Sequence, residues 1–232
     1  MSAKTAARKK TGTSKATETL ASTVYQELLS DILNGKLKPG HKLRLQALKT
    51  QYNVGNSPLR EALNRLSTNG MVVREENKGF RVSPASIAEL NELIQTRCWL
   101  EERAIRESVK NADDEYDEKI VLTFHRLSRI QPEKNGNYLS EEQEMRHFEF
   151  HQALLAACKS DILLGYCSQL HAQTTRYRNL AAVVEYREGH ENEEHKQLRD
   201  AVLARDADKA VKLLQAHYNI TAKIVIDSGS LD

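Results

Sequence analysis

The sequence is organised around one short stretch, Asn56-Ser57-Pro58-Leu59-Arg60-Glu61-Ala62-Leu63. Ser57 is a good N-cap, Pro58 suits the first position of a helix, and Gly70 suits the position just past a last turn. Between these limits, leucines repeat at helical spacing beside a small alanine that permits close packing: Leu59, Ala62, Leu63 and Leu66. The stretch therefore predicts a helix with one apolar face.

Two helical patterns precede this helix and a hairpin pattern follows it. The first pattern begins near Leu20 and stops before Gly35, and the second covers about residues 44–52. After the central helix, the β-prone runs 71–73 and 80–82 flank a glycine-containing loop of the kind that hairpins use. The order helix, helix, turn, helix, hairpin predicts a winged helix-turn-helix with a two-stranded wing.

The rest of the chain contains only helical patterns. Ser86 and Glu89 form a capping box that opens a long helix. On this helix we expect Trp99, the chain's single tryptophan, to pack against a neighbouring helix. Five further helices are expected near residues 113–130, 140–157, 161–181, 189–204 and 207–227, the last capped by Asp206. Short connections and the absence of internal repeats favour one all-α antiparallel bundle.

The fold expected from these patterns is mainly α and has two domains. Residues 1–16 read as a disordered basic tail, residues 17–83 as the winged helix-turn-helix, and residues 84–232 as the helical domain.

The net charge of +2 is unevenly distributed along the chain. Residues 1–80 hold 14 Lys and Arg against 6 Asp and Glu, whereas residues 81–232 hold 20 against 26. A basic front half joined to an acidic rear half indicates that only the front half meets a polyanion such as nucleic acid. A solvated basic surface with a flexible tail is the alternative explanation.

The composition also indicates the cellular compartment of the protein. The longest apolar runs span only a few residues, and the basic N-terminus lacks the apolar segment of a signal peptide. The three cysteines form no CxxC pair and are odd in number, which is typical of reduced thiols. We therefore expect a cytoplasmic protein that does not interact with membranes.

The start of the central helix carries the candidate DNA contacts. In helix-turn-helix proteins this end of the second helix enters the major groove, where Arg60 can donate two hydrogen bonds to guanine. Lys78 at the hairpin tip is placed to reach backbone or minor groove, although it could equally be a solvated loop lysine. The residues predicted to contact DNA are Arg44, Asn56, Ser57, Arg60, Lys78 and Gly79.

Histidines form the second constellation. His147 and His151 are spaced i,i+4 and project from one face of a helix, and His195 and His217 lie on two later helices. Four imidazoles from three helices can converge on one divalent cation inside a bundle. Packing without any metal remains the alternative. The other histidines are given no ligand role, because His125 and His171 have no matching partners, His41 lies in a turn and His190 lies in a loop-like stretch.

The Asn56–Leu63 string, Gly70 and the wing Lys78-Gly79-Phe80-Arg81-Val82 resemble the GntR family of regulators. The helical rear half is similar to their FadR-type C-terminal, or FCD, ligand-binding domain, and the resemblance covers about residues 18–228. It implies a homodimer that binds double-stranded operator DNA. The family commonly has arginine where Asn56 stands, so its base-contact pattern transfers to this chain at Arg60.

The resemblance also implies a metal site and a ligand. FCD domains often carry Asp-x-x-x-His and two later histidines, which match His151, His195 and His217, while His147 replaces the aspartate. A nitrogen ligand in place of a carboxylate favours zinc or nickel. Arginines in such a site suit an anionic effector, and the candidates here are Arg97, Arg176 and Arg178.

The details look most like the branch that controls 4-aminobutyrate and glutarate catabolism in carbon-starved bacteria. They imply a repressor of a catabolic operon that is released by a C4–C5 dicarboxylate or hydroxy acid. One alternative is a metal-dependent enzyme built on a helical bundle, although no HExxH motif, nucleophile elbow or phosphate loop occurs. Another is a constitutive DNA binder whose rear half only dimerises.

Overall fold

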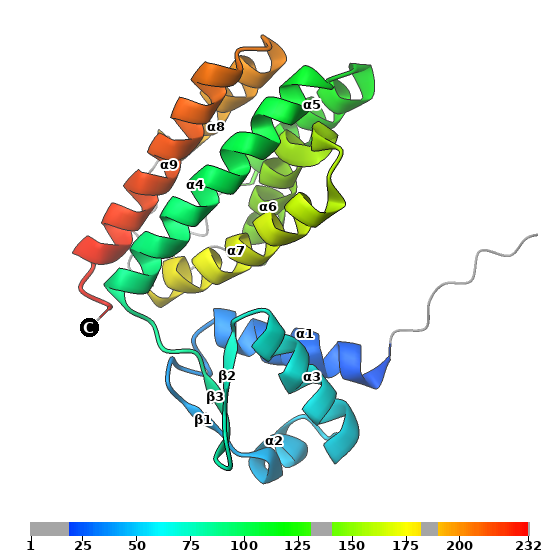
Figure 1. Ribbon diagram of the computed structural model, residues 1–232, viewed down its shortest axis with the longest axis vertical. Coiled ribbons are helices and arrows are strands. Elements are labelled where there is room, and N and C mark those ends of the chain that lie inside the picture. Colours follow the sequence, from blue (N-terminus) through cyan, green and yellow to red (C-terminus); the bar gives the residue numbers. More distant parts are fainter. Residues whose placement is uncertain (1–18, 131–140, 182–189, 232) are drawn as a thin grey trace, which may run out of the picture.

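The computed structural model describes residues 19–130, 141–181 and 190–231 (Figure 1). A smaller N-terminal part contains a short sheet, and a larger part follows in which the described regular elements are all helices. The mainly helical fold with an N-terminal winged helix-turn-helix is confirmed. The predicted tail, residues 1–16, lies outside the described residues. In the described ranges, no helix has both the length and the apolar character required to cross a bilayer.

Three helices and three short strands build the N-terminal part. They are α1 (Leu20–Leu33), β1 (Lys42–Leu43), α2 (Leu45–Gln51), α3 (Asn56–Thr68), β2 (Val72–Glu75) and β3 (Gly79–Val82). The antiparallel sheet has the order β1-β3-β2, and β2 and β3 form the predicted wing. Strand β1 was not predicted, because two residues are too few to show an alternating pattern; it pairs Leu43 with Phe80.

The start of α3 differs from the prediction by two residues. Gly55, not Ser57, is the N-cap, and its extended backbone is followed by helix from Asn56 onward. Pro58 therefore occupies the third helical position. The proline costs no hydrogen bond there, because the first four N–H groups of a helix have no partner within the helix. At the other end, Gly70 adopts φ +73°, the left-handed conformation for which it was singled out.

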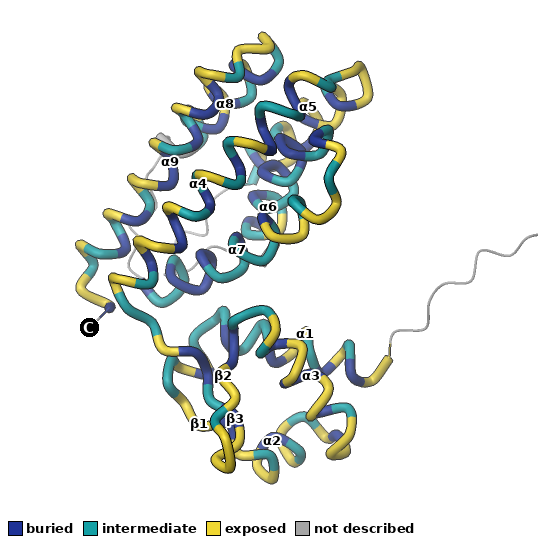
Figure 2. The backbone as a smooth tube through the Cα atoms, in the orientation of Figure 1, coloured by how far each residue is buried: buried dark blue, intermediate teal, exposed yellow. Residues whose placement is uncertain are grey.

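The core of the N-terminal part lies between α1 and α3. Helix α1 buries Val24, Leu28 and Ile32 at successive turns, and α3 buries the leucines of the quoted stretch. Figure 2 shows buried positions recurring along each helix in this way. The helical spacing that the sequence displays is therefore the spacing of the core contacts.

Within residues 84–130, 141–181 and 190–231, six α-helices and one short 3-10 turn form the C-terminal part. They are α4 (Ile87–Lys110), α5 (Asp114–Ser128), α6 (Glu141–Leu155), η1 (Ala156–Cys158), α7 (Asp161–Leu180), α8 (His190–Leu203) and α9 (Ala207–Asp227). Two predicted caps are confirmed, because Ser86 accepts a hydrogen bond from Glu89 N–H and Asp206 accepts one from Lys209 N–H. Helix α4 packs along both α7 and α9, and α6 packs against α5 (Figure 1).

The expectation for Trp99 is wrong, because its side chain is 62% exposed. The buried face of α4 contains Ile94, Arg97, Glu101 and Ile105. A residue two positions after Arg97 lies about 200° around the helix axis and so points away from that face. The core of the bundle thus receives two charged side chains, while the largest apolar one faces outward.

Helix α7 joins the two parts. Gln173 Nε2 donates to the carbonyl of Asn69 at 2.9 Å, and Gln169 Nε2 to that of Thr68 at 3.4 Å. These carbonyls lie at the C-terminal end of α3, where main-chain acceptors have no partner within the helix. The glutamines of α7 therefore cap the last turn of α3.

A second set of contacts holds the linker to α7. Arg176 is 1% exposed and donates to the carbonyls of Ser83 and Pro84 at 3.0 and 3.1 Å. The Tyr177 hydroxyl donates to Glu89 at the start of α4. The chain between the wing and the helical bundle is therefore fixed by two neighbouring residues of α7.

Leu63 is fully buried between α1 and α3, so Leu63→Ala should lower the free energy of unfolding by about 2–5 kcal/mol. Urea unfolding followed by far-UV circular dichroism measures the change. Asn64→Ala, at the exposed neighbouring position, is the matched control and should lie within about 0.5 kcal/mol of wild type. Equal losses for the two variants would contradict the core assignment.

Candidate metal centre and nucleic-acid interface

Four buried histidines, which we call the histidine quartet, meet inside the helical bundle. His147 and His151 come from successive turns of α6, His195 from α8 and His217 from α9, and each is at most 5% exposed. The Nε2 atom of His151 lies 3.1 Å from Nε2 of His147 and 3.3 Å from Nε2 of His195. One nitrogen from each ring lies within 4.8 Å of the other three. Packing of three helices thus brings the four predicted side chains together.

Two of the quartet rings are oriented by contacts on their outer nitrogens. His217 Nδ1 lies 2.9 Å from a carboxylate oxygen of Glu194. His151 Nδ1 lies 3.2 Å from the hydroxyl of Tyr218, which in turn donates to Glu101 at 2.5 Å. Contacts of this kind fix the ring orientation and tautomer of metal-ligating histidines. They leave the Nε2 atoms directed toward the centre of the quartet.

Burial sets the protonation of three of the four quartet rings. Desolvation lowers the pKa of His147, His151 and His195 well below the usual range. Neighbouring imidazoles and the cationic Arg178 lower the pKa of His147 further. These rings are therefore neutral at neutral pH, and a neutral imidazole has a lone pair to offer a cation without first losing a proton.

The donor set fits a tetrahedral divalent cation. Four nitrogens at about 2.0–2.1 Å from zinc lie roughly 3.3 Å from one another. The measured separations of 3.1 and 3.3 Å are close to that edge length. His195 Nδ1 is buried without a hydrogen-bond partner among the described residues, so its ring is left to act through Nε2. An all-nitrogen set of this kind suits zinc or nickel better than magnesium or calcium.

A second group of donors shares His147 with the quartet. Glu144 of α6 and His171 of α7 each offer an atom within 4.8 Å of the other and of His147. Arg178 lies in the same place, because its Nη2 donates to Glu144 at 2.6 Å and its Nη1 is 3.3 Å from His147 Nδ1. A guanidinium here repels a second cation. Glu144 therefore acts as the counter-ion of Arg178.

The expectation that His171 lacks matching partners is wrong. Its ring is 5% exposed and its centroid lies 5.9 Å from that of His147. No other histidine stands at helical spacing from it in α7, so periodicity gave no signal. Only the packing of α7 against α6 brings the ring to the quartet.

Two of the three predicted ligand-binding arginines lie beside the quartet. Arg97 is 3% exposed, donates to Glu101 at 2.9 Å and covers the ring of Tyr218, and its Nη2 lies 3.3 Å from His171 Nδ1. Arg178 contacts His147, as described above. Arg176 lies elsewhere: it is bound to the linker carbonyls, and we leave it out of the ligand site.

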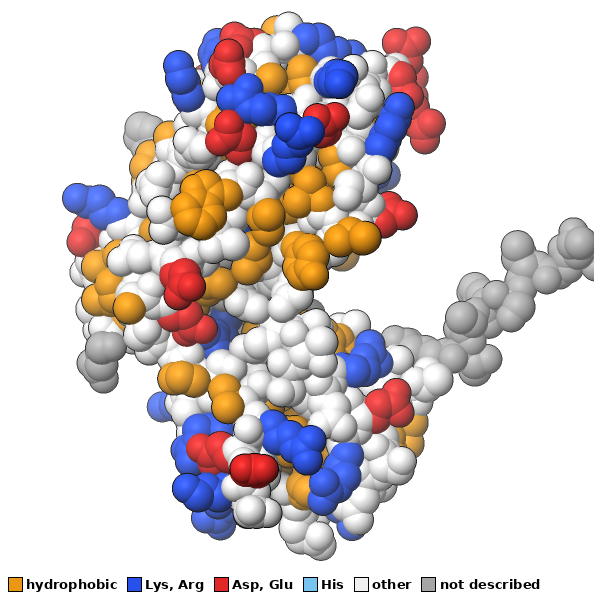
Figure 3. Space-filling view, in the orientation of Figure 1, with side chains coloured by type: hydrophobic (Ala, Val, Ile, Leu, Met, Phe, Trp, Pro, Cys, Tyr) orange, Lys and Arg blue, Asp and Glu red, His pale blue; other side chains and the backbone are white. Residues whose placement is uncertain are grey.

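The residues predicted to contact DNA all lie at the surface of the N-terminal part. Asn56, Ser57 and Arg60 are exposed on the first turns of α3, and Arg44, Lys78 and Gly79 are exposed on the N-cap of α2 and the wing. Lysine and arginine side chains gather on this end of the molecule (Figure 3). Arg74 is exposed on the wing strand β2, and Lys42 is exposed on β1 beside the wing; Lys42 was not singled out from the sequence because β1 was not recognised.

Two family models match the chain in succession. The model for bacterial regulatory proteins of the gntR family matches residues 20–82, and the FCD domain model matches residues 92–219. An uncharacterized HTH-type transcriptional regulator, BphR, of Paraburkholderia xenovorans (strain LB400) is 36% identical over 214 residues, 91% of this chain and 87% of that protein. The HTH-type transcriptional repressor GlaR of Escherichia coli (strain K12) is 32% identical over 198 residues, 83% of this chain and 90% of that protein.

Solved structures share the fold. Escherichia coli McbR/YncC superposes with a TM-score of 0.74 at 23% identity, over 90% of this chain and 98% of that one. A GntR regulator from Rhodococcus sp. RHA1 superposes with a TM-score of 0.69 at 17% identity, over 89% and 97% of the two chains. With both family models and two relatives above 30% identity in agreement, the chain belongs to the gntR family of bacterial regulatory proteins and carries an FCD domain.

Proposed function

We propose that the protein is a ligand-responsive repressor of a catabolic operon, released from operator DNA when a small carboxylate binds at a metal ion in the helical domain. The observation that carries this proposal is the double role of α7. The helix places His171 and Arg178 beside the histidine quartet, and its Gln173 caps the end of α3 at 2.9 Å. One rigid element thus touches both the candidate sensor and the candidate recognition helix.

DNA binding rests on the exposed start of α3. Arg60 supplies the bidentate donor that suits guanine, and Asn56 and Ser57 supply shorter polar groups for bases or phosphates. Arg44, Lys78 and Gly79 flank this surface from α2 and the wing. As a homodimer, the protein would present two such helices to a pseudo-palindromic operator.

The histidine quartet would hold zinc or nickel through one nitrogen of each ring. A bound cation supplies positive charge and, if one ligand yields, a position for an oxygen of an anionic effector. Arg97 and Arg178 both lie beside the quartet, and each has a carboxylate partner, Glu101 or Glu144. The two guanidiniums favour a second carboxylate on the effector, which is why a C4–C5 dicarboxylate or hydroxy acid is proposed.

Release follows if the effector prefers a different position of α7. The effector can shift the equilibrium only by binding one arrangement of the protein better than the other. A carboxylate that draws Arg178 away from Glu144 would displace α7 relative to α6. Because Gln169 and Gln173 hold the last turn of α3, the recognition helix would move with α7.

Replacing Arg60 with Ala should weaken specific DNA binding by about 1–3 kcal/mol, roughly 5- to 150-fold, because a bidentate base contact is lost. The operator is first selected from random DNA with the wild-type protein, and affinity is then measured by fluorescence anisotropy at a fixed salt concentration. Arg103→Ala removes one exposed charge from α4 and is the matched control. An unchanged affinity for Arg60→Ala would contradict the assignment of α3.

His151→Ala should lower the metal retained after dialysis below about one ion per chain, because one of the four candidate nitrogen ligands is lost. Mass spectrometry of the dialysed protein after loading with zinc or nickel measures the metal. Exposed His125→Ala is the control, and His171→Ala separates the quartet from the Glu144 group, so both should keep the ion. Full loading of His151→Ala would overturn the metal site.

Glutarate, succinate and 2-hydroxyglutarate should raise the melting temperature of the metal-loaded protein. A ligand at 100 times its Kd stabilises the folded state by about 2.7 kcal/mol. The shift, measured by differential scanning fluorimetry, should disappear after treatment with a chelator and in His151→Ala. Equal stabilisation with and without metal would mean that the carboxylate binds elsewhere.

A further inference from the structure

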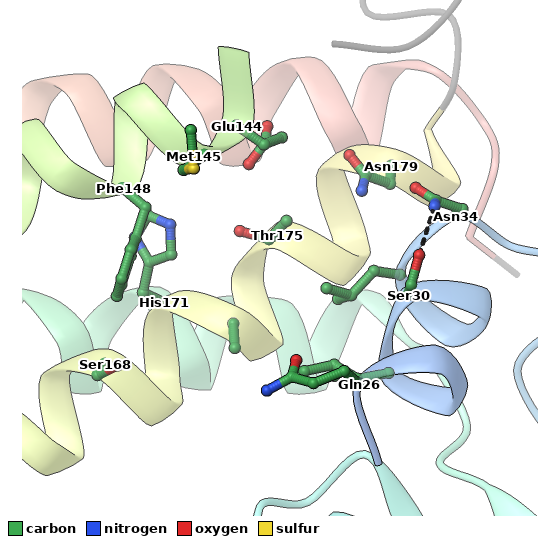
Figure 4. Close-up of a pocket in the computed structure, with 13 residues that line it drawn as sticks. Gln26, Ser30, Asn34, Glu144, Met145, Phe148, Ser168, His171, Thr175 and Asn179 are labelled. Atoms are coloured by element: carbon green, nitrogen blue, oxygen red, sulfur yellow. Dashed lines mark hydrogen bonds between the residues drawn. The ribbon is translucent and has the colours of Figure 1, made fainter. Parts of the chain in front are cut away.

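A cleft of about 550 Å³ lies between the N-terminal part and the helical bundle. Residues of α1, from Gln26 to Asn34, form one wall. Helix α6, around Met145 and Phe148, and helix α7, from Ser168 to Asn179, form the other walls (Figure 4). The volume is in the range of about 300–1,000 Å³ that ligands of drug size occupy, and clefts between domains are frequent binding sites.

The lining of the cleft is apolar with neutral polar groups at intervals. Leu29 and Leu33 of α1 lie on one side, and Met145 and Phe148 of α6 lie on the other. Amides and hydroxyls are interspersed with them on α1 and α7: Gln26, Ser30, Asn34, Ser168, Thr175 and Asn179. Side chains of these two kinds bind molecules that have an apolar body and a few hydrogen-bonding groups.

Charge distinguishes this cleft from the histidine quartet. No lysine or arginine occurs among the described residues that line it. Its one carboxylate, Glu144, is held by Arg178 at 2.6 Å. A dicarboxylate would have to leave water here without a cationic partner in the lining, which is costly. The cleft therefore suits an uncharged ligand.

An aromatic pair separates the cleft from the quartet. Phe148 and His171 both line the cleft, and their ring centroids lie 4.9 Å apart. None of the four quartet histidines lines the cleft, although His147 lies behind His171 at 5.9 Å between ring centroids. A molecule in the cleft would therefore contact α1, α6 and α7 without occupying the position proposed for the metal.

We propose that this cleft binds a second small effector, uncharged and amphipathic, which bridges the DNA-binding domain and the helical domain. Its contacts with α1 on one side and α7 on the other exist together only in one relative arrangement of the domains. Binding therefore favours that arrangement and changes the affinity for DNA. This site is separate from the position proposed for the metal-bound carboxylate, although α7 contacts both.

The test uses N-phenyl-1-naphthylamine, an uncharged aromatic amine whose fluorescence rises in apolar surroundings, with the full-length protein. Binding should be saturable and unaffected by a chelator, in contrast to the response to dicarboxylates. Ser168→Trp and Gln26→Trp fill the cleft from opposite walls and should each weaken binding at least tenfold. Ile162→Trp places the same side chain on α7 at a 77% exposed position and should bind the probe as the wild type does.

Circular dichroism identifies any variant that fails to fold, and Gln26→Trp, at an exposed position, tests the cleft if Ser168→Trp does not fold. Absent or non-saturable binding, or equal binding by wild type and a folded cleft variant, would overturn the site. The regulatory part has its own measurement. Operator DNA should change the probe's Kd by the same factor as the probe changes the operator's Kd, and a factor of one would overturn it.

Discussion

The bundle can bury its histidine quartet only because the surrounding polar groups are matched. An isolated charge or unpaired donor in such an interior costs several kcal/mol, so Arg97 and Glu101 must enter as a pair. Their 2.9 Å ion pair, closed by the Tyr218 hydroxyl, holds His151 from behind. The imidazoles of His147, His151 and His195 remain neutral because burial lowers their pKa values. The histidine quartet therefore lies in a polar interior in which the charged side chains are paired with one another.

Helix α7 contacts both the polar interior of the bundle and the N-terminal part. His171 and Arg178 lie against His147 of α6, whereas Gln169, Gln173 and Arg176 reach the end of α3 and the linker. The contacts with α3 and the linker are hydrogen bonds to main-chain carbonyls. Such hydrogen bonds can be replaced by hydrogen bonds to water more easily than packed apolar contacts can be separated. A junction of this kind is suited to two alternative arrangements. The cleft beside it is lined by the same two helices, α1 and α7.

The fold of the N-terminal part was largely predictable because its signals are local. The helical spacing of Val24, Leu28 and Ile32 indicates both a helix and its buried face. The glycine after α3 indicates where that helix ends. The same holds for the caps at Ser86 and Asp206, whose hydrogen bonds reach only three residues along the chain. The prediction failed where the local signal was too weak. Strand β1 has only two residues, and the N-cap of α3 is Gly55, which has no side chain to mark a cap.

For the candidate site, the sequence by itself determined that His147 and His151 share a face of α6, because i,i+4 spacing fixes this within one helix. Residue type and the expected helices made His195 and His217 candidates, and the family resemblance supported them. Tertiary structure alone decided that His171 joins them, that Arg176 serves the linker rather than the site, and that Trp99 faces outward while Arg97 is buried. The physical reason is the distance along the chain over which each kind of contact acts. Periodicity describes contacts three or four residues apart, whereas the packing of α7 against α4 and α6 depends on the shapes of whole helix faces that no local pattern specifies.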